Sequence, residues 1–302
     1  MAENTVKKIA TRESYGNSLK ELAEEFPNLV VLDADLAAAT KTGIFRKAYP
    51  DRHIDCGIAE ENMMGVAAGL SLVGKIPFVS SFAMFAAGRA FEQVRNSIGY
   101  PHLNVKIGAT HAGITVGEDG ATHQCNEDIA LMRTIPGMVV MCPSDDVEAR
   151  AAVRAALEYE GPVYIRFGRA AVPVINDHPG YHFEIGKGTV VREGKDVTIV
   201  ATGICVDSAL GAAKMLEEEG ISAEVVNICT IKPLDEEIII NSAKKTGKVV
   251  TVEEHSVIGG LGSAVCDCLC ANHPVPVKKV GMQDVFGESG SAAALVEKYG
   301  LD

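Results

Sequence analysis

The stretch IDCGIAEENMM, residues 54–64, leads directly into an apolar run of small residues, GVAAGLSLVG, at residues 65–74. Two adjacent carboxylates, Glu60 and Glu61, stand at the start of the helix that this run predicts. The free N–H groups of a first helical turn stabilise a carboxylate, so acidic residues are ordinary at this point. A carboxylate lowered into apolar surroundings instead holds its proton more tightly and is suited to proton transfer near neutral pH. The stretch alone leaves both interpretations open.

Short apolar runs alternate with amphipathic segments on both sides of this helix. The strand-like runs lie at residues 29–32, 77–81, 105–108, 138–141 and 162–167. This alternation predicts an α/β fold with a doubly wound, mostly parallel sheet. Ligands of such sheets bind at the carboxyl ends of the strands. The polar residues that follow strands at this edge are Asp35, Ser81, Thr110 and Arg169.

Two helical segments are predicted between these strands, one with a polar face and one with a capping residue before it. Residues 87–98 (AGRAFEQVRNSI) predict a helix whose polar side carries Arg89 and Arg95. Ser144 precedes a second predicted helix, residues 145–159, and a serine at this position is suited to cap the helix.

The second half of the chain shows the same alternation with few obvious chemical groups. Its predicted strands lie at residues 197–201, 223–226, 249–252 and 277–280, and its predicted helices at residues 208–219, 235–245 and 262–270. Proline and glycine interrupt residues 173–190, which predicts a linker. The sequence therefore predicts two doubly wound α/β domains, residues 1–172 and 191–302, joined by this linker.

The net charge of the chain limits the classes of molecule that it is expected to bind. It has 28 Lys and Arg against 40 Asp and Glu, a net charge of −12. This balance argues against nucleic acid or an anionic membrane as the main partner. The sequence has no apolar run of membrane-spanning length and no signal-peptide pattern at its start, so a cytoplasmic location is expected.

The eight cysteines are scattered in apolar segments, as buried free thiols would be. Cys266, Cys268 and Cys270 have the spacing C-x-C-x-C, and no matching pair lies nearby. Structural metal sites usually space their cysteines differently, so no metal ligands are expected in this chain.

Residues 109–126, ATHAGITVGEDGATHQCN, form a polar, glycine-rich loop after a predicted core strand. Glycines permit close approach of a ligand to the backbone, and such loops often carry function. His111 and His123 could hold an anionic or hydroxylated substrate, and Asp119 could accept a hydrogen bond from a hydroxyl. The alternative is a surface loop with unrelated histidines. His255, in EEHSVIGGLG, is interpreted as a structural or rim histidine, and IGGLG lacks the spacing of a dinucleotide-binding motif.

Three motifs together resemble the transketolase family of thiamine diphosphate enzymes. GIAEENM at residues 57–63 resembles the family's catalytic-glutamate motif, FAMF at residues 82–85 its aromatic patch, and THAGITVGEDGATHQ at residues 110–124 its substrate loop. Their order and separations also fit. The resemblance covers essentially the whole chain, but only the second and third domains of a full transketolase. It implies a pyrimidine-binding domain followed by a transketolase C-terminal domain.

The resemblance implies that Glu60 hydrogen-bonds N1′ of the cofactor's aminopyrimidine. Sharing a proton there favours the imino tautomer, whose N4′ can take the C2 proton of the thiazolium, while the cofactor carries the carbanion chemistry. Phe82 and Phe85 match the aromatics that stack on the aminopyrimidine, although plain core aromatics are the alternative. Asp35 is assigned to the cofactor site. Gly88 departs from the family, since many transketolases carry a further aromatic there.

The resemblance also implies a set of substrate contacts. Asp119 would bind the C2 hydroxyl of the donor, and His123 would act near the reacting carbonyl. Arg169, with His111 close to it, would bind a sugar phosphate, since a guanidinium matches phosphate geometry. Arg12 matches a second phosphate-binding arginine, against the alternative of an exposed helix-start charge. The remaining departure is Ala39, because some relatives carry serine there.

The GDG motif that holds the cofactor diphosphate through Mg²⁺ or Ca²⁺ is absent from the sequence. The resemblance therefore implies a separate N-terminal transketolase subunit that carries this motif and completes the site in a two-plus-two assembly. Three alternatives stay open: the beta subunit of a 2-oxo acid dehydrogenase, a 1-deoxyxylulose-5-phosphate synthase-like carboligase, and a non-catalytic scaffold. The synthases usually carry Asp where His111 stands, and a scaffold does not need Glu60 or Asp119.

Overall fold

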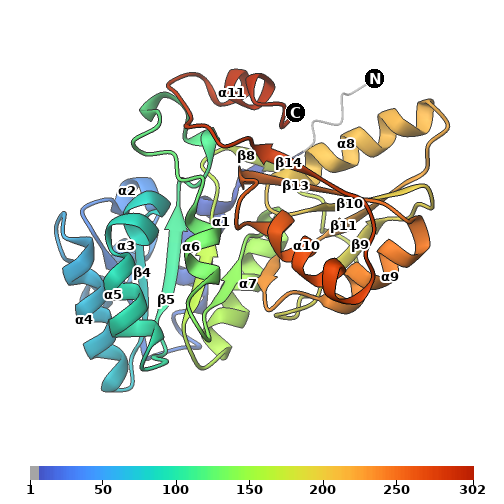
Figure 1. Cartoon of the computed structure of the whole chain (residues 1–302). Coiled ribbons are helices and arrows are strands. Elements are labelled where there is room, and N and C mark those ends of the chain that lie inside the picture. Colours follow the sequence, from blue (N-terminus) through green and yellow to red (C-terminus); the bar gives the residue numbers. More distant parts are fainter. Residues whose placement is uncertain (1–6) are drawn as a thin grey trace.

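The computed structural model describes residues 7–302 and shows two α/β units packed together (Figure 1). The first unit is built on a seven-stranded sheet with the strand order β12-β6-β7-β5-β4-β2-β3. The strands are β2 (Leu29–Asp33), β3 (His53–Asp55), β4 (Ile76–Phe82), β5 (Lys106–Thr110), β6 (Val139–Met141), β7 (Val163–Arg166) and β12 (Thr230–Lys232). All neighbours in this sheet are parallel except β12, which is antiparallel to β6. The predicted fold class is confirmed.

The helices that cover this sheet are α1 (Thr11–Leu22), α2 (Ala37–Thr40), α3 (Gly43–Ala48), α4 (Glu60–Leu72), α5 (Phe91–Gln93), α6 (Asp128–Arg133) and α7 (Asp146–Glu158). Asp145, not Ser144, caps α7, because the Asp145 carboxylate accepts the Glu148 N–H at 2.9 Å. The prediction of a Ser144 cap is wrong. The Ser144 hydroxyl instead donates to the Glu148 carboxylate at 2.7 Å.

The segment at residues 87–98 is helical, as predicted, but it is not a regular α-helix. Two π-helical segments, Met84–Arg89 and Val94–Gly99, flank the single turn of α5. A π-helix is rare and is frequent at functional sites. Arg89 is the last residue of the first π-helical segment.

The second unit has a five-stranded sheet in the order β14-β13-β10-β11-β9. Its strands are β9 (Thr189–Arg192), β10 (Val197–Ala201), β11 (Ala223–Asn227), β13 (Val249–Ser256) and β14 (Val277–Met282), and its helices are α8 (Cys205–Glu218), α9 (Glu236–Thr246), α10 (Leu261–Asn272) and α11 (Ala292–Lys298). Only β9 is antiparallel. A third, two-stranded sheet pairs β1 (Lys8–Ala10) with β8 (Ala171–Pro173).

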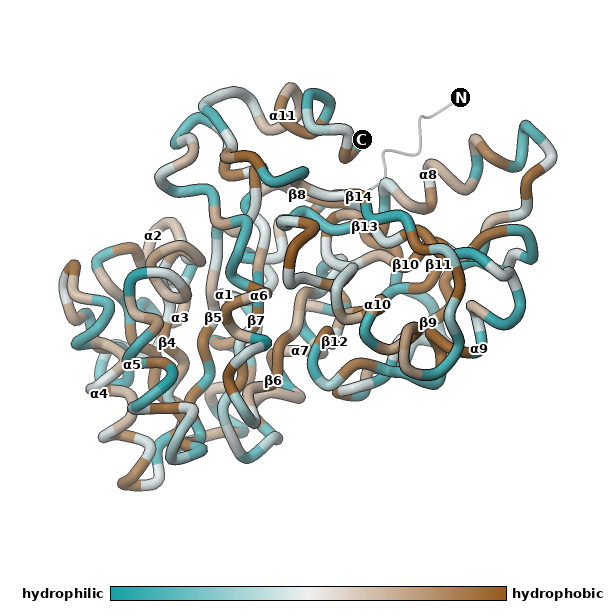
Figure 2. Tube along the Cα trace, viewed as in Figure 1, coloured by the Kyte–Doolittle hydropathy of each residue, from teal (hydrophilic) through white to brown (hydrophobic). Residues whose placement is uncertain are grey.

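The apolar side chains gather along the strands of both sheets, where the trace in Figure 2 is brown. One buried cluster contains Leu32 and Val79 of the first sheet together with Val200 and Val226 of the second. Packed side chains therefore join the two units, in addition to the connecting segment. β12 adds a backbone connection, since it lies in the second half of the chain and pairs with the first sheet.

Five cysteines are buried, whereas Cys56 and Cys266 are half-buried and Cys270 is exposed. The prediction that the thiols are buried is therefore wrong for these three. In residues 7–302, no group of three or more His, Cys, Asp and Glu side chains is arranged to hold a metal ion. Among the helices of the same residues, none is both long and apolar enough to cross a membrane.

Candidate functional site

The site lies at the carboxyl edge of the first sheet, where the strand order reverses between β2 and β4. Crevices at such reversals are the usual ligand sites of doubly wound sheets. The Asp55 carboxylate at the end of β3 accepts the N–H of Asp35 at 3.0 Å and the N–H of Gly57 at 2.9 Å. It thereby ties the loop after β2 to the turn that leads into α4.

Glu60 is the first residue of α4, and its side chain is 1% exposed. No side chain caps this helix, so the carboxylate is free to point to the strand edge. Its Oε1 accepts the Ser81 hydroxyl at 3.3 Å, and its Oε2 accepts Nη1 of Arg89 at 3.0 Å. Glu61, the next residue, is exposed. The structure thus separates the two adjacent carboxylates into one buried acid and one surface acid.

Arg89 is exposed, in agreement with its prediction on the polar side of this segment, but it also has a partner that the sequence did not reveal. The π-helical segment brings its guanidinium onto Glu60 and over the Phe85 ring, 4.4 Å from the ring centroid. Sequence reasoning missed this contact because it assumed a regular 3.6-residue period. Gly88, immediately before Arg89, lies against Met84, where an added Cβ would be 2.0 Å from the Met84 methyl.

The rings of Phe82 and Phe85 are nearly parallel, with centroids 5.9 Å apart and an angle of 11°. The Phe82 ring also stacks on His111 at 3.9 Å, and the Phe85 ring meets His123 edge-on at 5.3 Å. Aromatic groups in these arrangements attract one another beyond simple burial. Side chains that are far apart in sequence therefore form one aromatic wall next to Glu60.

His111 is buried, and its backbone has a φ of 56°, which is uncommon for a residue other than glycine. Its Nε2 lies 3.0 Å from Nη1 of Arg12, which can only donate, so Nε2 is the acceptor. Nδ1 lies 2.9 Å from the Thr110 hydroxyl. Burial, and then the charges of Arg12 and Arg169, lower the pKa of His111 to about 3. His111 is therefore neutral near pH 7.

Arg12 and Arg169 both contribute positive charge near His111. Arg12 donates to the Ala39 carbonyl at 2.9 Å, and burial followed by the charge of Arg169 lowers its pKa. Arg169 donates to the Val116 carbonyl and pairs with the exposed Glu118 at 3.3 Å. An anion between the two guanidinium groups would be stabilised by both charges.

The loop at residues 109–126 carries the remaining predicted side chains. Asp119 is exposed at the end of a 3₁₀ segment, Ile114–Asp119. His123 is half-buried, and its Nδ1 lies 2.9 Å from the Thr122 hydroxyl. The structure thus brings Glu60, Phe82, Phe85, His111 and His123 to one wall.

Asp35 is different, because its side chain is exposed and makes none of these contacts. The buried carboxylate of that loop is Asp33, which accepts the hydroxyls of Thr40 at 2.8 Å and Thr42 at 2.7 Å. We therefore regard Asp33 as the residue that shapes the loop. A polar residue inside an apolar run was the sequence signal for it.

A cavity of 610 Å³ opens beside this wall. Phe85, Arg89 and Thr122 line it on the side of the first unit, and Phe286 and Gly287 line it on the side of the second. Its volume lies in the range of small-molecule sites. Both units therefore contribute to the space next to Phe85 and Arg89.

Two family models match the chain: the transketolase pyrimidine-binding domain over residues 7–174 and the transketolase C-terminal domain over residues 186–302. A putative transketolase C-terminal section from Methanocaldococcus jannaschii is 53% identical over 96% of this chain and 92% of its own length. A 6-deoxy-6-sulfo-D-fructose transketolase subunit from Clostridium sp. (strain MSTE9) is 50% identical over 96% of this chain and 90% of its own length. Human transketolase is 36% identical over 98% of this chain, but over 47% of its own length.

The solved structures agree with these relatives. A split gene transketolase, described as an inactive beta4 tetramer, is 60% identical with a TM-score of 0.89, and the match covers 98% of this chain and 94% of that one. Transketolase from Campylobacter jejuni is 26% identical with a TM-score of 0.82, over 98% of this chain and 45% of that one. The resemblance inferred from the three motifs is confirmed. The chain belongs to the transketolase family, of which it has the pyrimidine-binding and C-terminal domains, as the C-terminal sections of split transketolases do.

Proposed function

We propose that this chain is the C-terminal subunit of a thiamine diphosphate-dependent transketolase that moves a two-carbon ketol unit from a ketose donor to an aldose acceptor. The observation that carries the proposal is the position of Glu60. A carboxylate that is 1% exposed lies beside two nearly parallel aromatic rings at the reversal point of a doubly wound sheet. The membership of the chain in the transketolase family supports the same reading.

The residues present fit the aminopyrimidine half of the cofactor. Glu60 can share a proton with a ring nitrogen through Oε2, which contacts the half-exposed side chain of Arg89. Phe85 is only half-buried and offers a ring face at the cavity. When bound, thiamine diphosphate supplies the carbanion chemistry that protein side chains lack. Glu60 would hold a proton at N1′, and its burial would keep water away from that proton.

The substrate contacts follow from the charges on the wall. We assign His111 and His123 to hydrogen bonds with the sugar, and Asp119 to the donor's C2 hydroxyl. Arg12 and Arg169 converge near His111 and are suited to a terminal anion. Relatives named for a sulfo-sugar and for apulose 4-phosphate are consistent with a donor or acceptor that carries an anionic end. A neutral His111, hydrogen-bonded to Arg12 through Nε2 and to Thr110 through Nδ1, helps to orient Arg12 without adding charge of its own.

A separate N-terminal subunit is required by this proposal. The sequence contains no GDG motif, so we assign the cofactor diphosphate and its Mg²⁺ or Ca²⁺ to that partner. The relative described as an inactive tetramer of beta chains is consistent with this requirement. We propose a two-plus-two assembly in which each site lies between one subunit of each kind.

The experiment mixes the chain with a GDG-bearing partner, thiamine diphosphate, Mg²⁺, a ketose phosphate donor and an aldose phosphate acceptor. Mass spectrometry then detects whether the acceptor sugar has gained two carbons and the donor has lost them. A parallel reaction with pyruvate separates this proposal from the alternatives. Ketol transfer without turnover of the 2-oxo acid supports the proposal. Turnover of the 2-oxo acid alone points to the dehydrogenase. Formation of 1-deoxyxylulose 5-phosphate and CO2 from pyruvate and glyceraldehyde 3-phosphate points to the synthase, and a synthase from Heliobacterium modesticaldum is 40% identical to this chain.

A further inference from the structure

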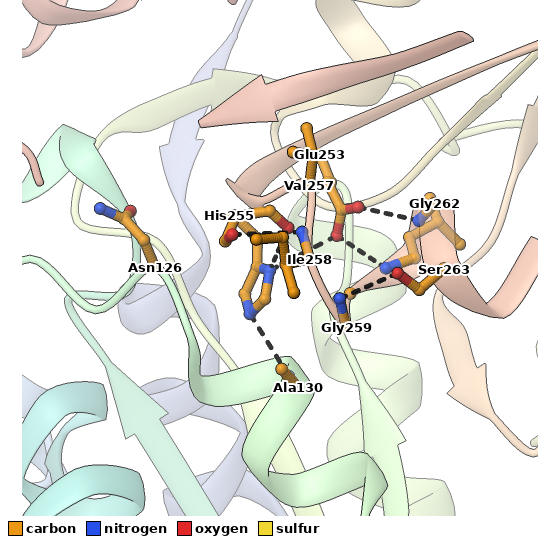
Figure 3. A network of polar contacts seen from close by, with 12 residues as sticks. Asn126, Ala130, Glu253, His255, Val257, Ile258, Gly259, Gly262 and Ser263 are labelled. Atoms are coloured by element: carbon orange, nitrogen blue, oxygen red, sulfur yellow. Dashed lines mark hydrogen bonds and ion pairs between the residues drawn. The ribbon is translucent and has the colours of Figure 1, made fainter. Parts of the chain in front are cut away.

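Three consecutive side chains at the end of β13 contact different parts of the molecule. Glu253 accepts the N–H of Leu261 at 2.7 Å and that of Gly262 at 2.8 Å, and so caps α10 within the second unit (Figure 3). His255 accepts the N–H of Ala130 in α6 at 3.3 Å. Side chains alternate across a strand, so the residue between them faces the other way. That residue is Glu254, and it reaches the loop of the first unit.

Glu254 is 3% exposed, and its Oε1 accepts the backbone N–H of Thr115 at 2.7 Å. Thr115 belongs to the 3₁₀ segment that ends at Asp119. Gly113, just before this segment, has a φ of 76°, and a Cβ there would lie 2.2 Å from the Glu254 carboxyl carbon. The loop backbone therefore lies directly against this carboxylate, and only glycine fits at the point of contact.

Arg166 at the end of β7 completes the contact at the base of the loop. Its Nη2 donates to the Cys125 carbonyl at 3.2 Å and to the Glu254 carbonyl at 2.7 Å, and its Nε donates to Asp128 at 2.9 Å. Its Nη1 lies 3.9 Å from the Glu254 carboxylate. Burial raises the pKa of Glu254, while the charge of Arg166 opposes that shift. A buried carboxylate without such partners would be strongly destabilising.

The second unit also holds the loop by apolar and backbone contacts. Ile114 packs in a buried cluster whose other members, Met282, Leu295 and Leu301, all belong to the second unit. Gln124 donates to the Glu288 carbonyl at 2.9 Å. In Figure 1, α11 lies over this loop. The beginning and the end of the loop are therefore both fixed by residues of the C-terminal domain.

We propose that the C-terminal domain positions the substrate loop for the reaction, and that Glu254 is the positioning residue. The inference rests on the proposed function, because it assumes that Asp119 and His123 bind substrate. Glu254 touches neither cofactor nor substrate. It acts through the N–H of Thr115, which holds the first turn of the segment in place ahead of the kink at Gly117, and Asp119 follows that kink.

The test compares Glu254→Gln with Glu253→Gln, its buried neighbour, which holds α10 instead of the loop. Amide hydrogen exchange of the full chain measures the strength of the hydrogen bond between the Thr115 N–H and Glu254, and this measurement does not depend on enzyme activity. Because a neutral oxygen accepts this bond more weakly, we expect Glu254→Gln to speed exchange at Thr115 by about tenfold. Glu253→Gln should speed exchange at Leu261 and Gly262 and leave Thr115 unchanged. The exchange rate at Thr115 should be higher in Glu254→Ala than in Glu254→Gln. If Glu254→Ala fails to fold, the comparison of Glu254→Gln with Glu253→Gln decides alone.

Kinetics of the enzyme assembled with its partner give the second readout. We expect Glu254→Gln to raise the donor KM by roughly fivefold or more with a smaller change in kcat, and Glu253→Gln to change neither beyond about twofold. Equal effects of the two variants on Thr115 exchange would overturn the proposal. A faster exchange in Glu254→Gln with an unchanged donor KM and kcat would overturn it as well, while leaving the transketolase proposal intact. Absence of ketol transfer in the wild-type assembly counts against the proposed function instead, and the exchange data then still decide whether Glu254 holds the loop.

Discussion

The guanidinium of Arg89 lies 3.0 Å from the carboxylate of Glu60 and covers the ring of Phe85. The carboxylate is 1% exposed and the arginine side chain 43%, so the charge that satisfies the buried acid comes from the solvent side. Without Arg89, the only remaining hydrogen-bond partner recorded for Glu60 among the described residues is the Ser81 hydroxyl, at 3.3 Å.

Arg89→Met should therefore lower the free energy of unfolding by about 1–2 kcal/mol, less than for a fully buried pair because the arginine is partly exposed. Urea denaturation followed by circular dichroism measures the change. Arg95→Met is the matched control, since Arg95 is exposed and bonds only Asn96 among the described residues. That control should stay within about 0.5 kcal/mol of the wild type. Equal losses in both variants would show that the pair with Glu60 contributes nothing.

The buried, neutral ring of His111 predicts a dependence of stability on pH. Its pKa is about 3 in the folded chain and about 6.5 when unfolded. Between these values the unfolded chain binds more protons, so this group destabilises the fold as the pH falls from 6.5 toward 3. The stability of the wild type should therefore fall relative to His111→Gln by up to about 1.4 kcal/mol per pH unit in this window. Urea denaturation of both proteins at pH 7, 6 and 5 measures the difference, and parallel curves would contradict the prediction.

Gly108 in β5 faces the buried ring of Tyr15, and a Cβ there would lie 2.3 Å from the Tyr15 hydroxyl. Tyr15 cannot move freely, because it stacks on Phe167 with centroids 4.6 Å apart. Gly108→Ala should thus destabilise the chain by about 1–3 kcal/mol. Gly211→Ala is the control, since Gly211 is an exposed residue of α8 with open space beyond its Cα, and it should stabilise the chain by about 0.5–1 kcal/mol. Thermal denaturation distinguishes the two, and a Gly108→Ala midpoint at or above that of the wild type would contradict this account of the packing.

The parts of the fold that depend on local pattern were predictable from the sequence. The apolar runs at residues 29–32 and 138–141 became β2 and β6, because a strand buried on both faces needs an uninterrupted apolar run. The resemblance of three motifs then identified the residues at the carboxyl edge. The structure brings Glu60, Phe82 and His111 together there, although their roles remain proposals.

The remainder depends on contacts between distant segments. Arg89 contacts Glu60 from the end of a π-helical segment, residues 84–89, and a 3.6-residue period does not predict that segment. β12 pairs with a strand about ninety positions earlier, and its three residues carry too little pattern to reveal this. Glu254 reads as an ordinary polar residue at the end of a strand, because its partner Thr115 lies in the other unit.

The rate of deuterium exchange at C2 of bound thiamine diphosphate tests the central claim most directly, because this exchange depends on the proton that Glu60 is proposed to hold at N1′. In the enzyme assembled with its partner, Glu60→Gln should slow the exchange by about 100-fold or more, whereas the exposed neighbour variant Glu61→Gln should stay within about threefold of the wild type. An exchange rate in Glu60→Gln equal to that of the wild type, with the cofactor bound, would contradict the account.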